Sequence, residues 1–195
     1  MAPDTNDVLL EQPTEVSGTI ANGGTARDGT KQIFGRWSFQ YPRAREWVEE
    51  RLHGRVLNAC AGKTHLSHDG EIVRNDMNPE RDADLHVDVA DIASHFDAAS
   101  FDCVVFDPPF DDFQAEDKYG NMRADNVFAA FRAFNELLRT NGTVITFGWN
   151  SWGMGSFSTF DREETVLFQR GACLRDVIAT VDRRTTATLT YGGFK

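Results

Sequence analysis

Short apolar runs, rich in Val and Ile and each followed by polar or turn-forming residues, constrain the fold of this chain more than any other feature. Runs of this length are typical of strands that are buried on both faces of a parallel sheet. The predicted strands are residues 55–58, 71–75, 85–87, 101–106 and 143–147. Stretches with helical spacing alternate with these runs, which indicates an open α/β sheet.

Helices are expected around this sheet. Tyr41-Pro42 opens the first one, and Gly54 is placed to end it. Two connections, residues 60–70 and 77–84, barely reach the ~10–12 residues of a complete crossover. We therefore expect turns there in place of helices. The other predicted helices are residues 91–96, 124–139 and 163–169.

The last part of the chain has a different pattern. Two β-rich runs, residues 173–181 and 185–190, are separated by Asp182, Arg183 and Arg184. This is the spacing of a hairpin. We therefore predict that the open sheet finishes in an antiparallel hairpin.

One domain is the expected organisation. The 195 residues, with a hydrophobic fraction of 41%, are enough for one core. Residues 1–30 are polar, rich in Gly, Thr and Asp, and lack sustained periodicity, so they predict a flexible N-terminal tail. Residues 31–195 are the predicted domain, with folding starting near Phe34.

Charge and cysteine content bear on compartment and partners. The net charge of -10 and the pI near 4.9 conflict with a nucleic-acid partner, because phosphate contacts require a local excess of Lys and Arg. Adaptation to high salt is one explanation.

Cys60, Cys103 and Cys173 are widely spaced and odd in number, so no disulfide framework is expected. No apolar run approaches the ~20 residues of a membrane span, so we expect a cytoplasmic protein with no membrane partner.

The motif Asp107-Pro108-Pro109-Phe110 ends the apolar run 101–106. It is expected at the carboxyl edge of the sheet, where open α/β folds bind ligands. Asp107 and the backbone carbonyl of Pro108 can accept both hydrogens of an aromatic amino group, and so direct its lone pair at an electrophile. The prolines stiffen the turn, and Phe110 offers a flat face for a base. The alternative is an ordinary Pro-Pro turn after a strand.

At these residues the sequence resembles the S-adenosylmethionine-dependent amino-group methyltransferases, whose signature is Asp/Asn/Ser-Pro-Pro-Tyr/Phe. The form present here is similar to that of the adenine-type DNA enzymes, and some ribosomal RNA guanine methyltransferases carry it as well. The resemblance implies a single Rossmann-like, open twisted sheet of about seven strands, mostly parallel with an antiparallel end. It covers roughly residues 41–195 and makes residues 31–195 a methyltransferase domain.

A loop of small residues follows the first predicted strand. Small side chains let the backbone approach a ligand closely, and the resemblance assigns this loop to the cofactor. The family usually has an acid where Asn58 stands and a second glycine near Thr64, so this sequence departs from the pattern at both places. The predicted cofactor-binding residues of the loop are Asn58, Ala59, Cys60, Ala61 and Gly62.

Acidic residues end the next two predicted strands. Asp76, followed by Met77, is expected to accept hydrogen bonds from the ribose hydroxyls of the cofactor. The spacing from Gly62 is shorter than the ~20 residues of a dinucleotide fold, which argues against NAD. Asp88 and Val89 resemble the position that contacts the cofactor's adenine, although a capping role for Asp88 is the alternative.

Two tryptophans, Trp149 and Trp152, lie in a Gly-flanked loop after the fifth predicted strand. They can line a base pocket or cover the sheet, and the sequence leaves both interpretations open. The five histidines show no metal-ligand spacing, so no metal site is expected.

These features predict an S-adenosylmethionine-dependent methyltransferase that acts on the exocyclic amino group of a nucleic-acid base. Adenine in DNA is the first candidate, and a base amino group in RNA is the second. A chain of this length has little room for a recognition domain, so we expect either low sequence specificity or a separate specificity partner. Two alternatives remain: a non-catalytic cofactor-binding subunit, and a protein glutamine methyltransferase, whose usual signature has Asn where Asp107 stands.

Overall fold

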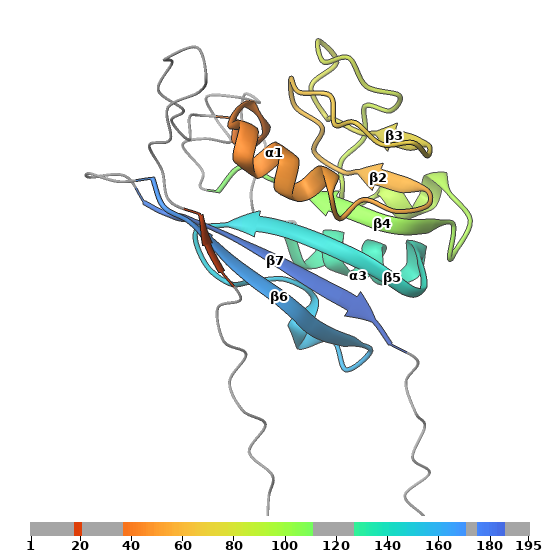
Figure 1. The fold of residues 1–195 in the computed structure, drawn as a ribbon. Helices are drawn as coiled ribbons and strands as arrows, with labels where there is room; N and C mark the ends of the chain where they lie inside the picture. Colours follow the sequence, from red (N-terminus) through yellow and green to blue (C-terminus); the bar gives the residue numbers. More distant parts are fainter. Residues whose placement is uncertain (1–17, 21–36, 111–126, 171–174, 186–195) are drawn as a thin grey trace, which may run out of the picture.

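A seven-stranded mixed sheet, in the order β1-β6-β7-β5-β4-β2-β3, forms the centre of the computed structural model (Figure 1). The structure describes residues 18–20, 37–110, 127–170 and 175–185. Neighbours from β3 to β5 are parallel, and β7 is antiparallel to both β5 and β6. The predicted sheet, mostly parallel with an antiparallel hairpin, is therefore confirmed. The strands are β1 (Gly18–Ile20), β2 (Val56–Asn58), β3 (Ile72–Arg74), β4 (Phe101–Phe106), β5 (Leu138–Gly148), β6 (Phe160–Phe168) and β7 (Val177–Arg184).

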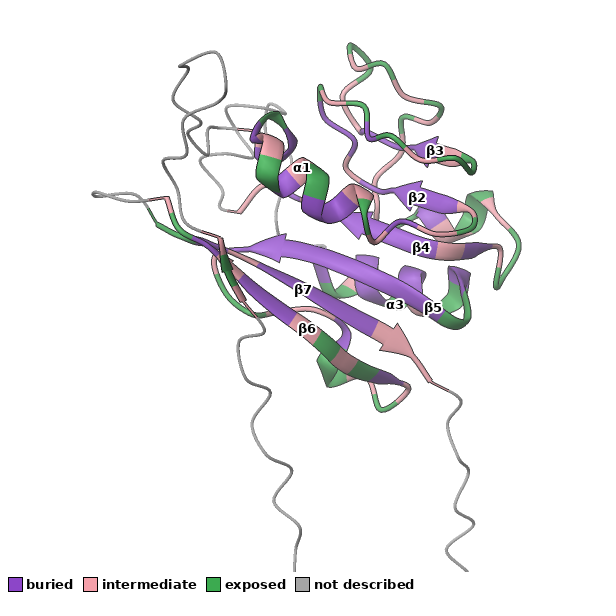
Figure 2. Ribbon diagram, in the orientation of Figure 1, coloured by how far each residue is buried: buried purple, intermediate pink, exposed green. Residues whose placement is uncertain are grey.

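Among the described residues, one α-helix packs on each face of the sheet. Helix α1 (Pro42–Glu49) begins with a proline, whose fixed φ suits the first helical turn, and it packs on the face that carries Val105. Helix α3 (Val127–Leu137) packs on the face that carries Val104. The central strands are buried by these two layers (Figure 2). Among the described residues, no helix has the length and apolar character needed to cross a membrane.

The connections near β2 and β3 are short, as predicted. Residues 59–71 form turns and extended segments without a helix, and the link from β3 to β4 contains only the 3-10 helix η2 (Ile92–His95). The predicted strand at 85–87 is wrong, because Leu85 forms only an isolated bridge with Asn75. The side chain of Asn75 bonds both the N–H and the C=O of Val87, and so takes the place of a strand partner.

The hairpin lies earlier in the chain than predicted. The helix predicted at 163–169 is wrong, because residues 163–168 belong to strand β6, which pairs with β7 in antiparallel fashion. Asp182, Arg183 and Arg184, predicted as a turn, lie within β7. Asp182 pairs with Arg162 of β6, so its charge is compensated inside the sheet. Cys173 and residues 186–190 of the predicted hairpin lie outside the described residues.

Strand β1 lies within the segment that was expected to be a flexible tail. Its three residues pair in parallel with Val166, Leu167 and Phe168 of β6. The backbone hydrogen bonds of an edge strand explain why a segment without apolar periodicity is ordered here. The domain boundary at residue 30 stays a prediction, since the neighbouring residues 1–17 and 21–36 are outside the described part.

Asp182 is expected to contribute strongly to stability. It is 0% exposed, pairs with Arg162, and accepts the Met154 N–H at 2.9 Å. Asp182→Ala leaves Arg162 without its counter-charge in a mostly buried position, which typically costs about 3 kcal/mol of unfolding free energy. Urea denaturation measures this loss. The control is Glu163→Ala, whose partner Arg183 is exposed and whose removal is expected to cost below about 1 kcal/mol. Equal losses for the two variants would contradict the prediction.

Candidate functional site

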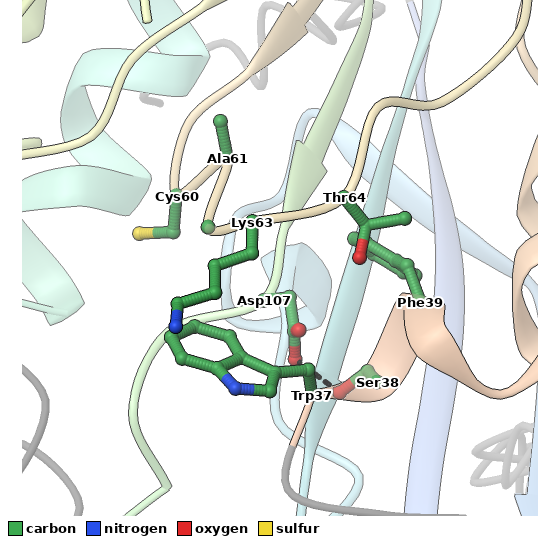
Figure 3. A pocket seen from close by; sticks show the side chains of 9 residues that line it. Trp37, Ser38, Phe39, Cys60, Ala61, Lys63, Thr64 and Asp107 are labelled. Carbon is green, nitrogen blue, oxygen red and sulfur yellow. Dashed lines mark hydrogen bonds between the residues drawn. The ribbon is translucent and has the colours of Figure 1, made fainter. Parts of the chain in front are cut away.

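A narrow cleft at the carboxyl edge of the sheet brings together three segments that are distant in sequence (Figure 3). It is lined by the turn Trp37–Phe39, by residues 60–64 after β2, and by Asp107 after β4. Its cavity volume is about 20 Å³, which is room for about one water molecule. The cleft is therefore too narrow in this structure to hold a larger ligand.

The loop after β2 owes its close packing to its small residues. Gly62 has a φ of +59°, a conformation that glycine adopts without strain. A Cβ at this position would lie 3.3 Å from the ring of Trp37, so the indole already touches the loop backbone. The N–H of Gly62 donates to Asp76 Oδ2 at 2.8 Å, and the N–H of Ala61 donates to the Asn75 carbonyl at 2.8 Å. The loop is thus held in one conformation.

Asn58 ends β2 with its side chain 0% exposed. Neither Oδ1 nor Nδ2 of its amide has a hydrogen-bond partner among the described residues. A buried polar group without a partner costs about 1–3 kcal/mol, so such a group at a ligand edge indicates a missing polar partner. This is the position at which the sequence departs from the acid of the family.

The two predicted acids bond backbone groups in this structure. Asp76 is 1% exposed, and besides the Gly62 N–H it accepts the Asn78 N–H at 3.0 Å. Asp88 Oδ1 accepts the Ala90 N–H at 2.9 Å, which is an Asx turn, whereas the residue at the N-cap of the following helix η2 is Asp91. Their neighbours Met77 and Val89 are half-buried.

Only part of the predicted site lines the cleft. Cys60, Ala61, Gly62 and Asp107 do, whereas the other predicted residues lie around it. Those outside the cleft lining are Asn58, Ala59, Asp76, Met77, Asp88, Val89, Pro108, Pro109 and Phe110.

The sequence analysis assigned no role to Asn75, the last residue of the predicted strand 71–75. It is buried, and its Nδ2 donates to the carbonyls of Ala59 and Val87, at 3.1 Å in both cases. Its side chain therefore ties the carboxyl ends of three segments together. In the sequence, Asn75 is a single polar residue that ends an apolar run. This pattern is too common to have identified its role.

The motif after β4 faces the cleft through its first residue. Asp107 is half-buried, and its Oδ1 accepts a hydrogen bond from Ser38 Oγ at 3.0 Å. Pro108 is buried and fixes the turn. The ring of Phe110 contacts Trp149, with centroids 5.7 Å apart and an interplanar angle of 63°. The sequence analysis missed Ser38 and the cleft-lining Trp37 and Phe39, because no local pattern marks them.

The two tryptophans after β5 have different places. Trp149 contacts Phe110 on one side, and the guanidinium of Arg175 lies 4.3 Å from its ring. Trp152 packs against Phe131 of α3 with centroids 6.1 Å apart, and its Nε1 donates to the Phe147 carbonyl. Trp149 therefore packs beside the Asp-Pro-Pro-Phe motif, while Trp152 covers the sheet.

Comparisons with known proteins bear on the fold. No protein-family model matches the chain, and no curated protein matches its sequence. Solved structures do match. The Burkholderia thailandensis 1,6-didemethyltoxoflavin-N1-methyltransferase, with bound 1,6-didemethyltoxoflavin and S-adenosylhomocysteine, is 14% identical, with a TM-score of 0.55 over 74% of this chain and 78% of that one.

Two further solved structures are similar to this chain in fold. Escherichia coli yhhF, provisionally named a methyltransferase, has a TM-score of 0.55 and 12% identity over 86% of this chain and 98% of that one. A Clostridium thermocellum protein, provisionally named an rRNA methylase, has a TM-score of 0.50 and 12% identity over 72% and 95%. The chain has the fold of these proteins, and the predicted Rossmann-like class is confirmed. Their names cover different substrates, so the fold alone does not select one.

The two described cysteines are expected to differ sharply in reactivity. Cys60 is partly exposed and lines the cleft, whereas Cys103 is buried in β4, where burial raises the pKa of its thiol to about 11. The thiolate is the reactive form, so an alkylating reagent at about pH 8 should modify Cys60 much faster. Peptide mass spectrometry over time measures both rates in the folded protein. Faster modification of Cys103 would contradict the structure.

Proposed function

We propose that this chain is an S-adenosylmethionine-dependent methyltransferase that acts on the exocyclic amino group of a nucleic-acid base, with adenine in DNA as the first candidate. The observation that carries the proposal is the cleft itself. It joins the small-residue loop Cys60–Gly62, suited to a cofactor, to Asp107 of an Asp-Pro-Pro-Phe motif, suited to an amino group. Both segments follow neighbouring parallel strands, so they open at the same edge.

The residues around the loop fit the cofactor chemically. Gly62 allows close backbone approach, and the buried amide of Asn58 offers a donor and an acceptor that have no described partner. Asp76 and Asp88 would hold the ribose and adenine ends, in addition to the backbone groups they already bond. The cleft must widen to admit a molecule of this size.

The cofactor supplies an electrophilic methyl group, and the chain must make a poor nucleophile reactive. The lone pair of a base amino group is delocalised into the ring. Asp107, with the Pro108 carbonyl, accepts the two amino hydrogens and so favours the geometry in which the lone pair points at the methyl. Phe110 offers a stacking face for the extruded base, and Trp149 packs edge-on against the Phe110 ring.

Cations at this edge reduce the conflict between an acidic chain and a phosphate-bearing substrate. Lys63 and Arg81 lie 5.6 and 5.5 Å from the ring of Trp37, and Arg175 lies 4.3 Å from that of Trp149. Positive groups interleaved with aromatic rings are typical of surfaces that bind single-stranded or extruded bases. They favour a nucleic acid over a small free base.

RNA is the second candidate, because the Asp-Pro-Pro-Phe motif also resembles that of ribosomal RNA enzymes and a protein named as an rRNA methylase shares the fold. A separate specificity partner stays part of the proposal. A non-catalytic cofactor-binding subunit is the remaining alternative, and it is supported by the unusual Asn58. Transfer of a labelled methyl group to a nucleoside would exclude it.

Asp76→Ala is expected to weaken binding of S-adenosylhomocysteine by about tenfold to a hundredfold, because a charged acceptor at the ribose and the anchor of the Gly62 N–H are both lost. Isothermal calorimetry measures the affinity. Asp161→Ala, the same change at an exposed position of β6, is the control and should bind normally. Unchanged affinity in a folded Asp76→Ala protein would remove Asp76 from the site.

Asp107→Ala is expected to lower methyl transfer by about 10²–10³-fold while largely sparing cofactor affinity, because one preorganised acceptor at the reacting centre is lost. The measurement uses radiolabelled S-adenosylmethionine with separate DNA, RNA and protein pools, followed by nucleoside analysis. The substituted protein is first shown to be folded by its thermal unfolding. A near wild-type rate would contradict the assignment of this motif, and label in the protein pool alone would contradict the substrate class.

A further inference from the structure

We propose that Ser38 is a positioning residue for Asp107, holding the carboxylate in the orientation that methyl transfer needs. The inference rests on the proposed function and adds a residue to that same site. Ser38 Oγ donates to Asp107 Oδ1 at 3.0 Å, across 69 positions of sequence, and Ser38 is 5% exposed. Figure 3 shows this bond among the side chains that line the cleft.

The backbone that carries Ser38 is fixed. Residues 38–40 form the 3-10 turn η1, in which the Trp37 carbonyl accepts the Gln40 N–H at 3.1 Å and the Ser38 carbonyl accepts the Tyr41 N–H at 3.2 Å. The next side chain, Phe39, is buried and packs edge-on against Phe147 of β5 at 5.4 Å between centroids. The hydroxyl of Ser38 is therefore presented from a rigid element.

The same turn reaches the cofactor loop. Trp37, directly before Ser38, touches Gly62 with its ring, so adjacent residues contact the predicted cofactor loop and the predicted catalytic motif. This arrangement aligns the two halves of the site through one short turn that precedes α1.

Asp107 needs such a partner for a conformational reason. The terminal torsion of an aspartate is broad, so a carboxylate without a fixed partner samples many orientations. A bond from Ser38 to Oδ1 restricts that torsion and sets the plane in which the carboxylate meets an amino hydrogen. A misplacement of about 1 Å at a reacting centre can cost roughly a hundredfold in rate.

Three variants test the role of Ser38. Ser38→Ala should lower kcat by about tenfold to a hundredfold while leaving the affinity for S-adenosylhomocysteine nearly unchanged. Ser38→Thr keeps the hydroxyl and should restore most of the rate. Thr159→Ala is the matched control, because it removes a hydroxyl whose bond to Asn135 lies at the opposite edge of the sheet, and its rate should equal that of the wild type.

A double-substitution cycle separates positioning from general structure. If Ser38 acts through Asp107, then Ser38→Ala should cause no further loss in an Asp107→Ala protein, measured in single-turnover assays. Equal losses in both backgrounds, or no loss from Ser38→Ala in an active protein, would overturn this inference alone. An inactive wild-type protein would contradict the proposed function and this inference with it. Thermal unfolding of each variant shows that the changes in rate are measured on folded protein.

Discussion

The parallel pairing of β2 with β4 is the constraint on which the site depends. Asn58 lies opposite Val105, so the two strands end side by side, and the segments that follow them leave the sheet at the same edge. The Gly62 loop and Asp107 become neighbours for this reason, although β3, η2 and β4 lie between them in sequence. A shift of register by one residue would turn the buried side chains of β2 to the opposite face, so the core selects the register that aligns the site.

Polar side chains replace the missing crossover helices. Backbone groups at strand ends need partners, and in a longer chain a helix would cover them. Here Asn75 bonds both backbone groups of Val87 and the carbonyl of Ala59, while Asp76 holds the N–H of Gly62. Asp76, which we propose holds the ribose of the cofactor, therefore also holds the loop in place. A change at Asp76 is consequently expected to affect both the loop and cofactor binding.

Prediction from sequence succeeded where a pattern is local. The apolar run of β4 and Pro42 at the start of α1 mark their elements without reference to the rest of the chain. It failed at 163–169, because the acidic residues of β6 conceal its strand alternation. Their charges are compensated by residues distant in sequence, since Glu163 pairs with Arg183 of β7 and Glu164 pairs with Arg51, which follows α1. The separate places of Trp149 and Trp152 were also not predictable, since both follow the same strand and differ only in what packs against them.

The sequence by itself determined the class of sheet, the placing of Asp107 after a buried strand, and the small-residue loop at Gly62, because each depends on local periodicity or on side-chain size. The tertiary structure alone decided that Ser38 meets Asp107, that Trp37 lies against the glycine loop, and that Asn58 is buried with an amide that has no partner among the described residues. These contacts join residues from different strands and turns. Their distances depend on strand order and register, which no single segment of the chain encodes.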